Sequence, residues 1–167
     1  LDTFLDHLDK RVSYRIPGTA VFLASNSNGV PPVVMRMVKR FHALHKTVIL
    51  LTVTTENVPY MCGNDGDEER IEVSELGGGF YRVLVRYGFM ETPNVPGTIE
   101  KAFKKLDLYY WGRDILYVLG HETFVEHNRG SMPPFQQSIF AFLSRNARNA
   151  TDYFGLPPEQ VIELGTQ

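Results

Sequence analysis

The chain has 167 residues, of which 43% are hydrophobic and 22% charged, and its formal net charge is −2 at pH 7. This length suits one globular domain, and the slight negative charge argues against general nucleic-acid binding by bulk electrostatics. The single cysteine, Cys62, excludes an internal disulfide framework, and no apolar run approaches the ~20 residues that cross a bilayer.

The N-terminal segment is predicted to be a short amphipathic helix that runs into a tether. Apolar residues recur here at helical spacing: Leu1, Phe4, Leu5 and Leu8. Two interpretations stay open, namely a frayed terminus that caps the core and a connection to a preceding domain. Because the chain begins without methionine, we expect it to be part of a longer protein, with residues 1–14 as the tether and 15–167 as one α/β domain.

A β-α-β unit is predicted between residues 15 and 53. Residues 19–24 are almost wholly apolar, which is typical of a strand that is covered by helices on both faces. Turn formers follow, and Pro31-Pro32 can open a helix. Apolar residues then recur at helical spacing as far as Leu44. Residues 48–53 form a second apolar strand, and the crossover rule predicts that the two strands are parallel.

An antiparallel hairpin is predicted to follow this unit. Residues 62–69 are rich in glycine and acidic side chains, and we interpret them as an exposed excursion because the complete calcium-loop pattern is absent. A short strand at 70–73 and a long strand at 80–89 flank a triple-glycine turn. The period-two pattern of the long strand places Arg82 and Arg86, with Leu84, on one face and Tyr81, Val83, Val85 and Tyr87 on the other.

The remaining elements complete an α/β pattern. We expect a helix at 97–106, a strand at 115–119, a helix from Pro133-Pro134 to Ala150 and a last strand at 161–164. The predicted fold class is therefore α/β, with a mixed, mostly parallel sheet flanked by helices and a β-hairpin addition.

No catalytic or metal-binding constellation emerges from the sequence. His42 and His45 lie three residues apart on the predicted helix, but no third ligand accompanies them, and we interpret them as part of a basic solvated face. His121-Glu122 and His127 do not fit the spacing of zinc proteases, and Cys62 lacks an adjacent histidine that would activate it. We therefore expect neither an enzyme nor a metal site.

Polar residues nevertheless occur where open α/β sheets bind small molecules, outside the carboxyl ends of parallel strands. The candidate ligand-binding residues are Ser25, Asn26, Asn28, Thr54, Thr55, Gly120 and His121. With a helix N-terminus they can receive an anionic group such as a phosphate, which Arg82 and Arg86 can neutralise if their face opens to solvent. Two alternatives stay open: the polar residues only build turns, and the arginines pair with acidic neighbours.

Six short motifs occur in the following order: R-I-P-G-T-A-V-F-L (15–23), G-F-Y-R-V (79–83), Y-G-F-M-E-T-P (87–93), L-G-H-E-T (119–123), F-A-F-L-S-R-N-A (140–147) and V-I-E-L-G (161–165). Together they resemble the cytosolic C-terminal domain of the KUP (Kup/HAK/KT) potassium-uptake permeases. The chain departs from the family at two places. His121 stands where the family usually has arginine, which puts any role of that arginine in doubt, and residues 61–69 form an enlarged loop.

The resemblance implies a domain on the cytoplasmic face of the cell membrane, attached to a membrane-embedded potassium–proton symporter whose transport chemistry lies outside this chain. Related potassium importers carry cytosolic domains similar to universal stress proteins, which dimerise, and several bacterial importers are inhibited by cyclic di-AMP. By analogy, the resemblance implies a universal-stress-protein-like homodimer that regulates potassium uptake by binding cyclic di-AMP or another adenine nucleotide at its interface. The alternatives are a ligand-free dimerisation and stability module of the transporter and a stand-alone enzyme.

Overall fold

The computed structural model describes residues 11–24, 29–61, 70–110, 112–122 and 150–166. Its strands are β1 (Tyr14–Ala24), β2 (Ala43–Glu56), β3 (Ile71–Gly77), β4 (Phe80–Gly88), β5 (Ile115–Glu122) and β6 (Val161–Thr166). Its helices are α2 (Pro32–Phe41), α3 (Val95–Lys105) and α5 (Ala150–Tyr153), with 3-10 turns η2 (Gly112–Asp114) and η3 (Pro158–Gln160).

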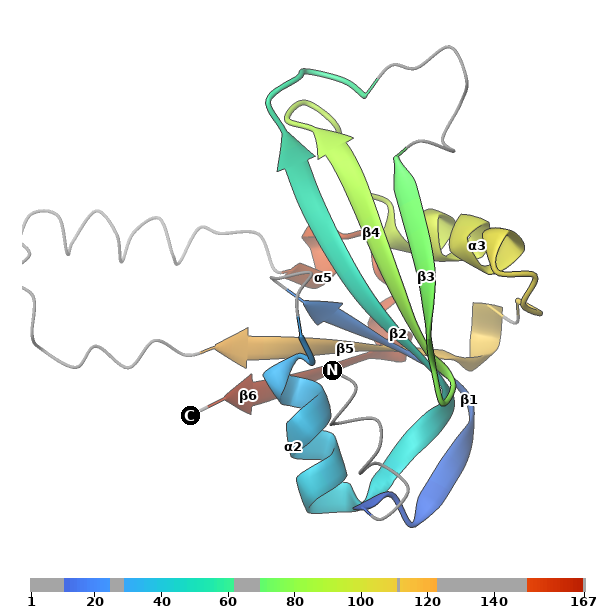
Figure 1. The fold of residues 1–167 in the computed structure, drawn as a ribbon. Helices are drawn as coiled ribbons and strands as arrows, with labels where there is room; N and C mark the ends of the chain where they lie inside the picture. The colour runs from blue at the N-terminus through green and yellow to red at the C-terminus, as the bar shows by residue number, and fades with distance from the viewer. Residues whose placement is uncertain (1–10, 25–28, 62–69, 111, 123–149, 167) are drawn as a thin grey trace, which may run out of the picture.

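The described residues build one six-stranded sheet with the order β3-β4-β2-β1-β5-β6 (Figure 1). Every neighbouring pair of strands is parallel except β3 and β4, which are antiparallel. Gly77, Gly78 and Gly79 close this hairpin with positive φ, a backbone conformation that glycine adopts without steric cost. The predicted mixed, mostly parallel sheet and its hairpin are confirmed.

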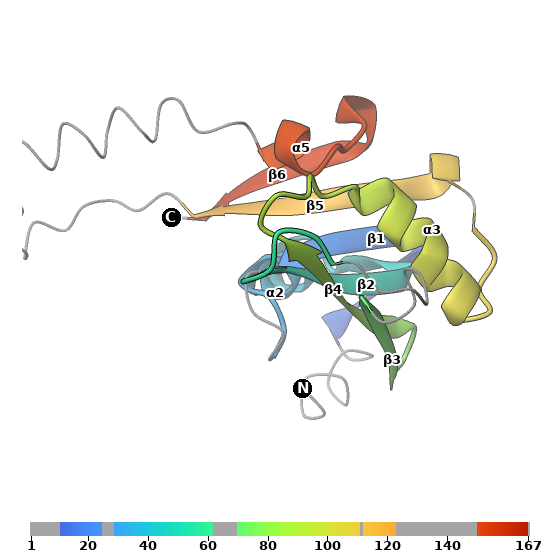
Figure 2. The same cartoon turned by 90° about the horizontal axis from the view of Figure 1, so that it is seen from above.

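Helices lie on both sides of the sheet, so two separate cores form (Figure 2). Successive residues of β1 illustrate the division, because Val21 packs into the core beneath α3 and Phe22 into the core beneath α2. Successive strand side chains point to opposite faces, and both of these are fully buried. The prediction that the apolar run 19–24 is a strand buried on both faces is therefore confirmed.

The helix α2 is shorter than its sequence pattern predicts. It ends at Phe41, because His42 adopts the left-handed conformation with a φ of 51° and donates its backbone N–H to the carbonyl of Val38. The next strand already begins at Ala43, which pairs with Tyr14 of β1. His45 therefore lies on β2, and the prediction that His42 and His45 share a helix is wrong. Pairing with β1 outweighs the helical spacing of the apolar residues.

Several predicted segments lie outside the described residues. These are residues 1–10 of the tether, the acidic excursion 62–69 with Cys62, and the predicted helix from Pro133 up to residue 149. The described residues resume at Ala150, the first residue of α5.

Candidate functional site

The carboxyl ends of the parallel strands diverge instead of meeting at one point. In Figure 1, β2 and β4 end at the top of the molecule, whereas β5 and β6 point to its left, as expected from sheet twist. Thr54 lies directly beside Arg86 in the β2–β4 register. Gly120 lies on β5, on the far side of β1. Residues 25–28 and the side chain of His121 lie outside what the structure describes.

The two predicted arginines share one face of β4 but differ in their surroundings. Arg86 lies between two carboxylates, with Nη2 2.6 Å from Glu72 Oε1 and Nε 3.7 Å from Glu56 Oε1. Arg82 lies four residues earlier, about 13 Å along the strand. Thr54 donates its hydroxyl to the carbonyl of Val85 at 3.3 Å. Of the two alternatives for Arg86, phosphate binding and pairing with acidic neighbours, the structure shows the pairing.

The first turn of α2 offers few N–H donors to an anion. Pro31 and Pro32 carry no N–H, and the amides of Val34 and Met35 donate to the carbonyl of Pro31 at 3.0 and 3.4 Å. Gly120 lies beside this turn, since a Cβ added to it would lie 3.6 Å from the Cβ of Val33. This helix start is therefore a weaker phosphate cradle than a helix N-terminus usually is.

A pocket of about 370 Å³ lies where β4 passes into α3. Its lining consists of Tyr60, Arg70, Ile71, Tyr87, Met90, Glu91, Thr92, Asn94, Gly97, Thr98 and Lys101. Most of these residues belong to the motif 87–93 or to the start of α3. The pocket is situated beyond the carboxyl end of β4, the kind of position where the sequence predicts a ligand, but it is formed by different residues.

An ion pair and backbone hydrogen bonds hold one wall of this pocket. Glu91 accepts from Arg70 Nη2 at 3.0 Å through Oε1 and from the amide of Gly88 at 2.6 Å through Oε2. Arg70 also donates to the carbonyl of Met61 and lies 5.7 Å from the ring centre of Tyr87. Burial alone would raise the pKa of Glu91, but hydrogen bonds from the Gly88 and Met61 amides and the charge of Arg70 outweigh it and lower the pKa.

Hydroxyl groups join β4 to the start of α3. The hydroxyl of Tyr87 lies 2.7 Å from the hydroxyl of Thr98 and accepts from the backbone N–H of Asn94 at 3.2 Å. The side chain of Asn94 in turn caps the helix, because its Oδ1 accepts from the N–H of Gly97 at 3.0 Å. Strand and helix therefore keep a defined relative position at the pocket.

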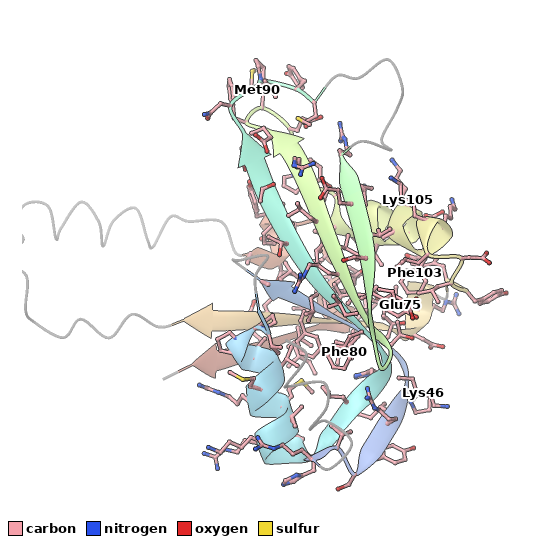
Figure 3. The ribbon with its side chains drawn as sticks, in the orientation of Figure 1. Lys46, Glu75, Phe80, Met90, Phe103 and Lys105 are labelled. Atoms are coloured by element: carbon pink, nitrogen blue, oxygen red, sulfur yellow. The ribbon has the colours of Figure 1, made fainter. Side chains whose placement is uncertain are left out.

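Two exposed apolar residues of the pocket lining, Tyr60 and Met90, belong to a group of four exposed apolar residues that we call the apolar tip: Val58, Tyr60, Phe89 and Met90. Two backbone hydrogen bonds join their segments, from Phe89 to Val58 at 2.9 Å and from Met90 to Pro59 at 3.0 Å. Gly88 is needed for this approach, because a Cβ there would come within 2.4 Å of the Pro59 carbonyl oxygen. Met90 marks the tip in Figure 3.

Comparison with known proteins identifies the family of this chain. The family model described as "K+ potassium transporter C-terminal domain" matches residues 17–167. The chain belongs to this family. It is 45% identical over its whole length to the probable potassium transport system protein Kup 1 of Syntrophobacter fumaroxidans, and 40% identical to relatives from Myxococcus xanthus and Geobacter sulfurreducens. The resemblance drawn from the six motifs is confirmed.

The family match concerns only part of the length of its full-length members. The chain spans about a quarter of the length of these curated relatives, 24% to 26%. Among the described residues, no helix is long and apolar enough to cross a membrane, and no group of three or more His, Cys, Asp or Glu side chains could hold a metal ion. The family is one of transporters and not of enzymes. No solved structure matches, so the likeness to universal stress proteins stays a prediction.

The residues that line the pocket were not predicted from the sequence. Arg70 and Glu91 are 21 positions apart, and they meet only because β3 and β4 form a hairpin. One signal was present in the motif Y-G-F-M-E-T-P, whose first three residues are the end of the strand predicted at 80–89 and whose glutamate was not predicted to contact it. A glutamate three residues after a strand-ending glycine can accept hydrogen bonds from that turn, as Glu91 does from Gly88.

Proposed function

We propose that this chain is the cytoplasmic regulatory domain of a potassium–proton symporter. The observation that carries this proposal is the division of length within the family. The relatives are named potassium transport system proteins and are about four times as long as this chain. Because no described helix suits a bilayer, ion translocation is assigned to the remainder of the protein, and this domain controls it.

The regulatory signal in this proposal is an adenine nucleotide, with cyclic di-AMP as the first candidate. The pocket volume of about 370 Å³ lies within the range that small-molecule sites occupy. Tyr60 offers an aromatic face on which a base can stack, and Lys101 brings positive charge toward a phosphate, whereas the charge of Arg70 is already paired with Glu91. The second candidate location is the carboxyl end of β2, where Thr54 and Thr55 lie beside Arg86 on the β4 face; Gly120 lies apart from it on β5.

A dimer of the domain suits this ligand. Cyclic di-AMP consists of two identical halves, and a two-fold dimer presents the same residues to each half. The nucleotide then favours one relative orientation of the two domains, and differential affinity for two orientations is what regulation requires. The segment 1–14 is assigned to transmit that preference to the rest of the transporter.

Calorimetric titration of the 167-residue chain with cyclic di-AMP tests this proposal, with ATP, AMP and cyclic di-GMP as comparators. We expect selective binding of one cyclic di-AMP per two chains. Replacing Tyr60 and Lys101 by alanine should abolish the heat if the pocket is the site, whereas replacing Arg82 and Arg86 should do so if the β4 face is. The absence of heat and of a thermal shift with every nucleotide would overturn the nucleotide proposal.

A ligand-free dimerisation and stability module is the second candidate, and the apolar tip favours it. Phe89 and Met90 are each 59% exposed, and exposed apolar residues that gather at one place mark interaction surfaces. This candidate predicts a dimer in sedimentation equilibrium without nucleotide, and a monomer when Phe89 and Met90 are replaced by serine. A monomer in both cases would exclude it.

A further inference from the structure

The α2 side of the sheet is less fully covered by the described residues than the α3 side. Neighbouring strands are about 4.8 Å apart, so a six-stranded face is roughly twice as wide as one helix with its side chains. The described core on this side includes residues of α2 and of no other helix. On the opposite side, α3 and the segment after α5 both contribute to the core (Figure 2). The rim of the α2 core consists of partly buried apolar residues: Val12, Val30, Met37, Leu76, Leu116 and Leu164.

Phe41, the last residue of α2, is exposed although it lies on the inward side of the helix. It follows Val34 by seven residues and Val38 by three, so helical spacing places it on the same side as these two buried valines. Its exposed fraction is nevertheless 63%. An inward-facing aromatic ring at the end of a helix offers a packing surface to a further apolar element.

The segment before β1 approaches this same end of α2. Ser13 donates its N–H to the carbonyl of His42 at 2.7 Å, and Nδ1 of His42 lies 3.2 Å from the carbonyl oxygen of Arg11. Val12, between them, packs against the α2 core. Arg11, the first described residue, is helical. The part of the chain that immediately precedes Arg11 therefore starts beside the end of α2.

Residues 1–10 have the apolar pattern that suits this surface. At 100° per residue, Leu1, Leu5 and Leu8 fall within about 60° of one another on a helix, and Val12 continues the same stripe. Because Val12 already packs against the α2 core, a helix that continues backwards from Arg11 turns its leucines toward the same core.

Charge favours the same contact. The three aspartates of this segment, at positions 2, 6 and 9, fall together on one flank of the apolar stripe. From Arg11 to Thr55 the sequence has no aspartate or glutamate, and its lysines and arginines there are Arg11, Arg15, Arg36, Lys39, Arg40 and Lys46. An acidic flank is attracted to such a region, whereas the same basic region of a second copy would be repelled.

We propose that residues 1–10 form an amphipathic helix that packs, within the same chain, against Phe41 and the rim of the α2 core. The leucine stripe continues the contact that Val12 already makes, and the aspartates face basic side chains of the region 11–46. Apolar burial supplies most of the affinity, and the charges select the segment over a second copy of the α2 side.

Docking of this segment would give the domain a fixed lever. The family model describes a C-terminal domain and begins at residue 17, so in the longer relatives the residues that match 1–10 lie toward the rest of the transporter. A docked helix passes the orientation of the domain to what precedes it, and a free segment does not. Only this consequence rests on the proposed regulatory function, because the docking itself requires neither a nucleotide nor a dimer.

Hydrogen–deuterium exchange of the 167-residue chain, followed by mass spectrometry, tests the proposal. We expect the amides of residues 2–10 to exchange about thirtyfold more slowly than those of a free peptide of the same sequence, because burial of one large apolar side chain favours a docked state by about that factor. Phe41→Ser and Leu8→Ser should each reduce this protection about tenfold. Asp6→Asn/Asp9→Asn should reduce it about threefold, and only at low salt, since exposed ion pairs contribute little and are screened.

The matched control is Phe89→Ser, which makes the same change at a ring that is 59% exposed and belongs to the apolar tip, on β2 and β4 instead of α2. This control should leave the protection of residues 2–10 within about twofold of the unmodified chain, and far-ultraviolet circular dichroism with a thermal melt verifies that each variant folds. Free exchange of residues 2–10 overturns the proposal, as does protection that Phe41→Ser leaves unchanged or that Phe89→Ser reduces equally.

Protection that increases with protein concentration overturns docking within one chain and reassigns the surface to a second copy. The nucleotide titration is independent of these outcomes. If residues 2–10 exchange freely while cyclic di-AMP still binds, only the docking proposal is lost. If no nucleotide binds while the segment stays protected, the docking stands and the nucleotide proposal is lost.

Discussion

The helices on the two sides of the sheet are attached to it by different interactions. On the α3 side, the start of the helix is joined to β4 by the Tyr87 and Thr98 hydroxyls and capped by Asn94. On the α2 side, the N-cap residue Pro31 makes no side-chain hydrogen bond, and the helix is held through a core of apolar side chains. Directional bonds thus position the pocket residues on the α3 side, whereas α2 is held by burial alone, which leaves its outer side available for charged side chains.

The largest expected effects come from the two cores themselves. Phe80 packs into the α2 core and is fully buried, and Phe103 packs into the α3 core at 3% exposure (Figure 3). Replacing either with alanine should reduce the free energy of unfolding by about 3–5 kcal/mol, as measured by urea denaturation. Because the sheet separates them, the double variant should show the sum of the two losses within about 0.5 kcal/mol. A larger deviation would mean that the two cores are coupled through the sheet.

The next effect concerns the ion pair at the pocket. Glu91→Gln removes a partly buried charged acceptor from Arg70 and Gly88, which should cost about 1.5–3 kcal/mol at pH 7. The folded-state pKa of Glu91 is lowered, so its contribution is complete above the unfolded pKa, about 4.3. That contribution is lost as the pH falls through the lower folded pKa. The stability difference between the two proteins, measured by urea denaturation, should therefore shrink in acid, and a difference independent of pH would contradict this assignment.

Much of the fold could be predicted because it depends on local patterns. The apolar run 19–24 and the alternation within 80–89 correctly gave two strands, and proline correctly marked the start of α2. The end of α2 could not be predicted, since the helical spacing of apolar residues continues to Leu44, although Ala43 and Leu44 already pair with β1. The predicted start of α3 at Gly97 is two residues late, because the helix begins at Val95 and contains Pro96 in its first turn, where proline is well tolerated.

The candidate site was less predictable because its residues come from distant segments. The rule that ligands collect at the carboxyl ends of parallel strands indicated an edge of the sheet. It did not indicate that the strands diverge there and separate Gly120 from Thr54. Charge compensation is also invisible in sequence, since Glu56 and Glu72 approach Arg86 only once β2 and β3 flank β4.

A smaller effect is expected at the cap that distinguishes α3 from α2. Asn94→Ala removes the acceptor for the N–H of Gly97 and should cost about 1 kcal/mol, as measured by thermal or urea denaturation. Asn94→Ser should restore most of the loss, because serine caps helices nearly as well as asparagine. Equal losses with serine and with alanine would show that helix capping by the Asn94 side chain is not the source of the stability.

The smallest expected effect comes from a polar group that neither side of the sheet satisfies. His45 is buried on β2, and its Nδ1 has no hydrogen-bond partner among the described residues. Burial lowers the pKa of His45 below its ordinary value of 6.5, so the unfolded chain takes up a proton at a higher pH than the folded protein does. Stability from this residue is therefore greatest above about pH 6.5 and decreases as the pH falls through that value. Urea midpoints measured between pH 8 and pH 5.5 should decline more steeply for the unmodified chain than for His45→Gln, in a range where Glu91 stays ionised. Parallel curves would show that the imidazole takes up its proton equally well in both states, and that burial at this strand carries no electrostatic cost.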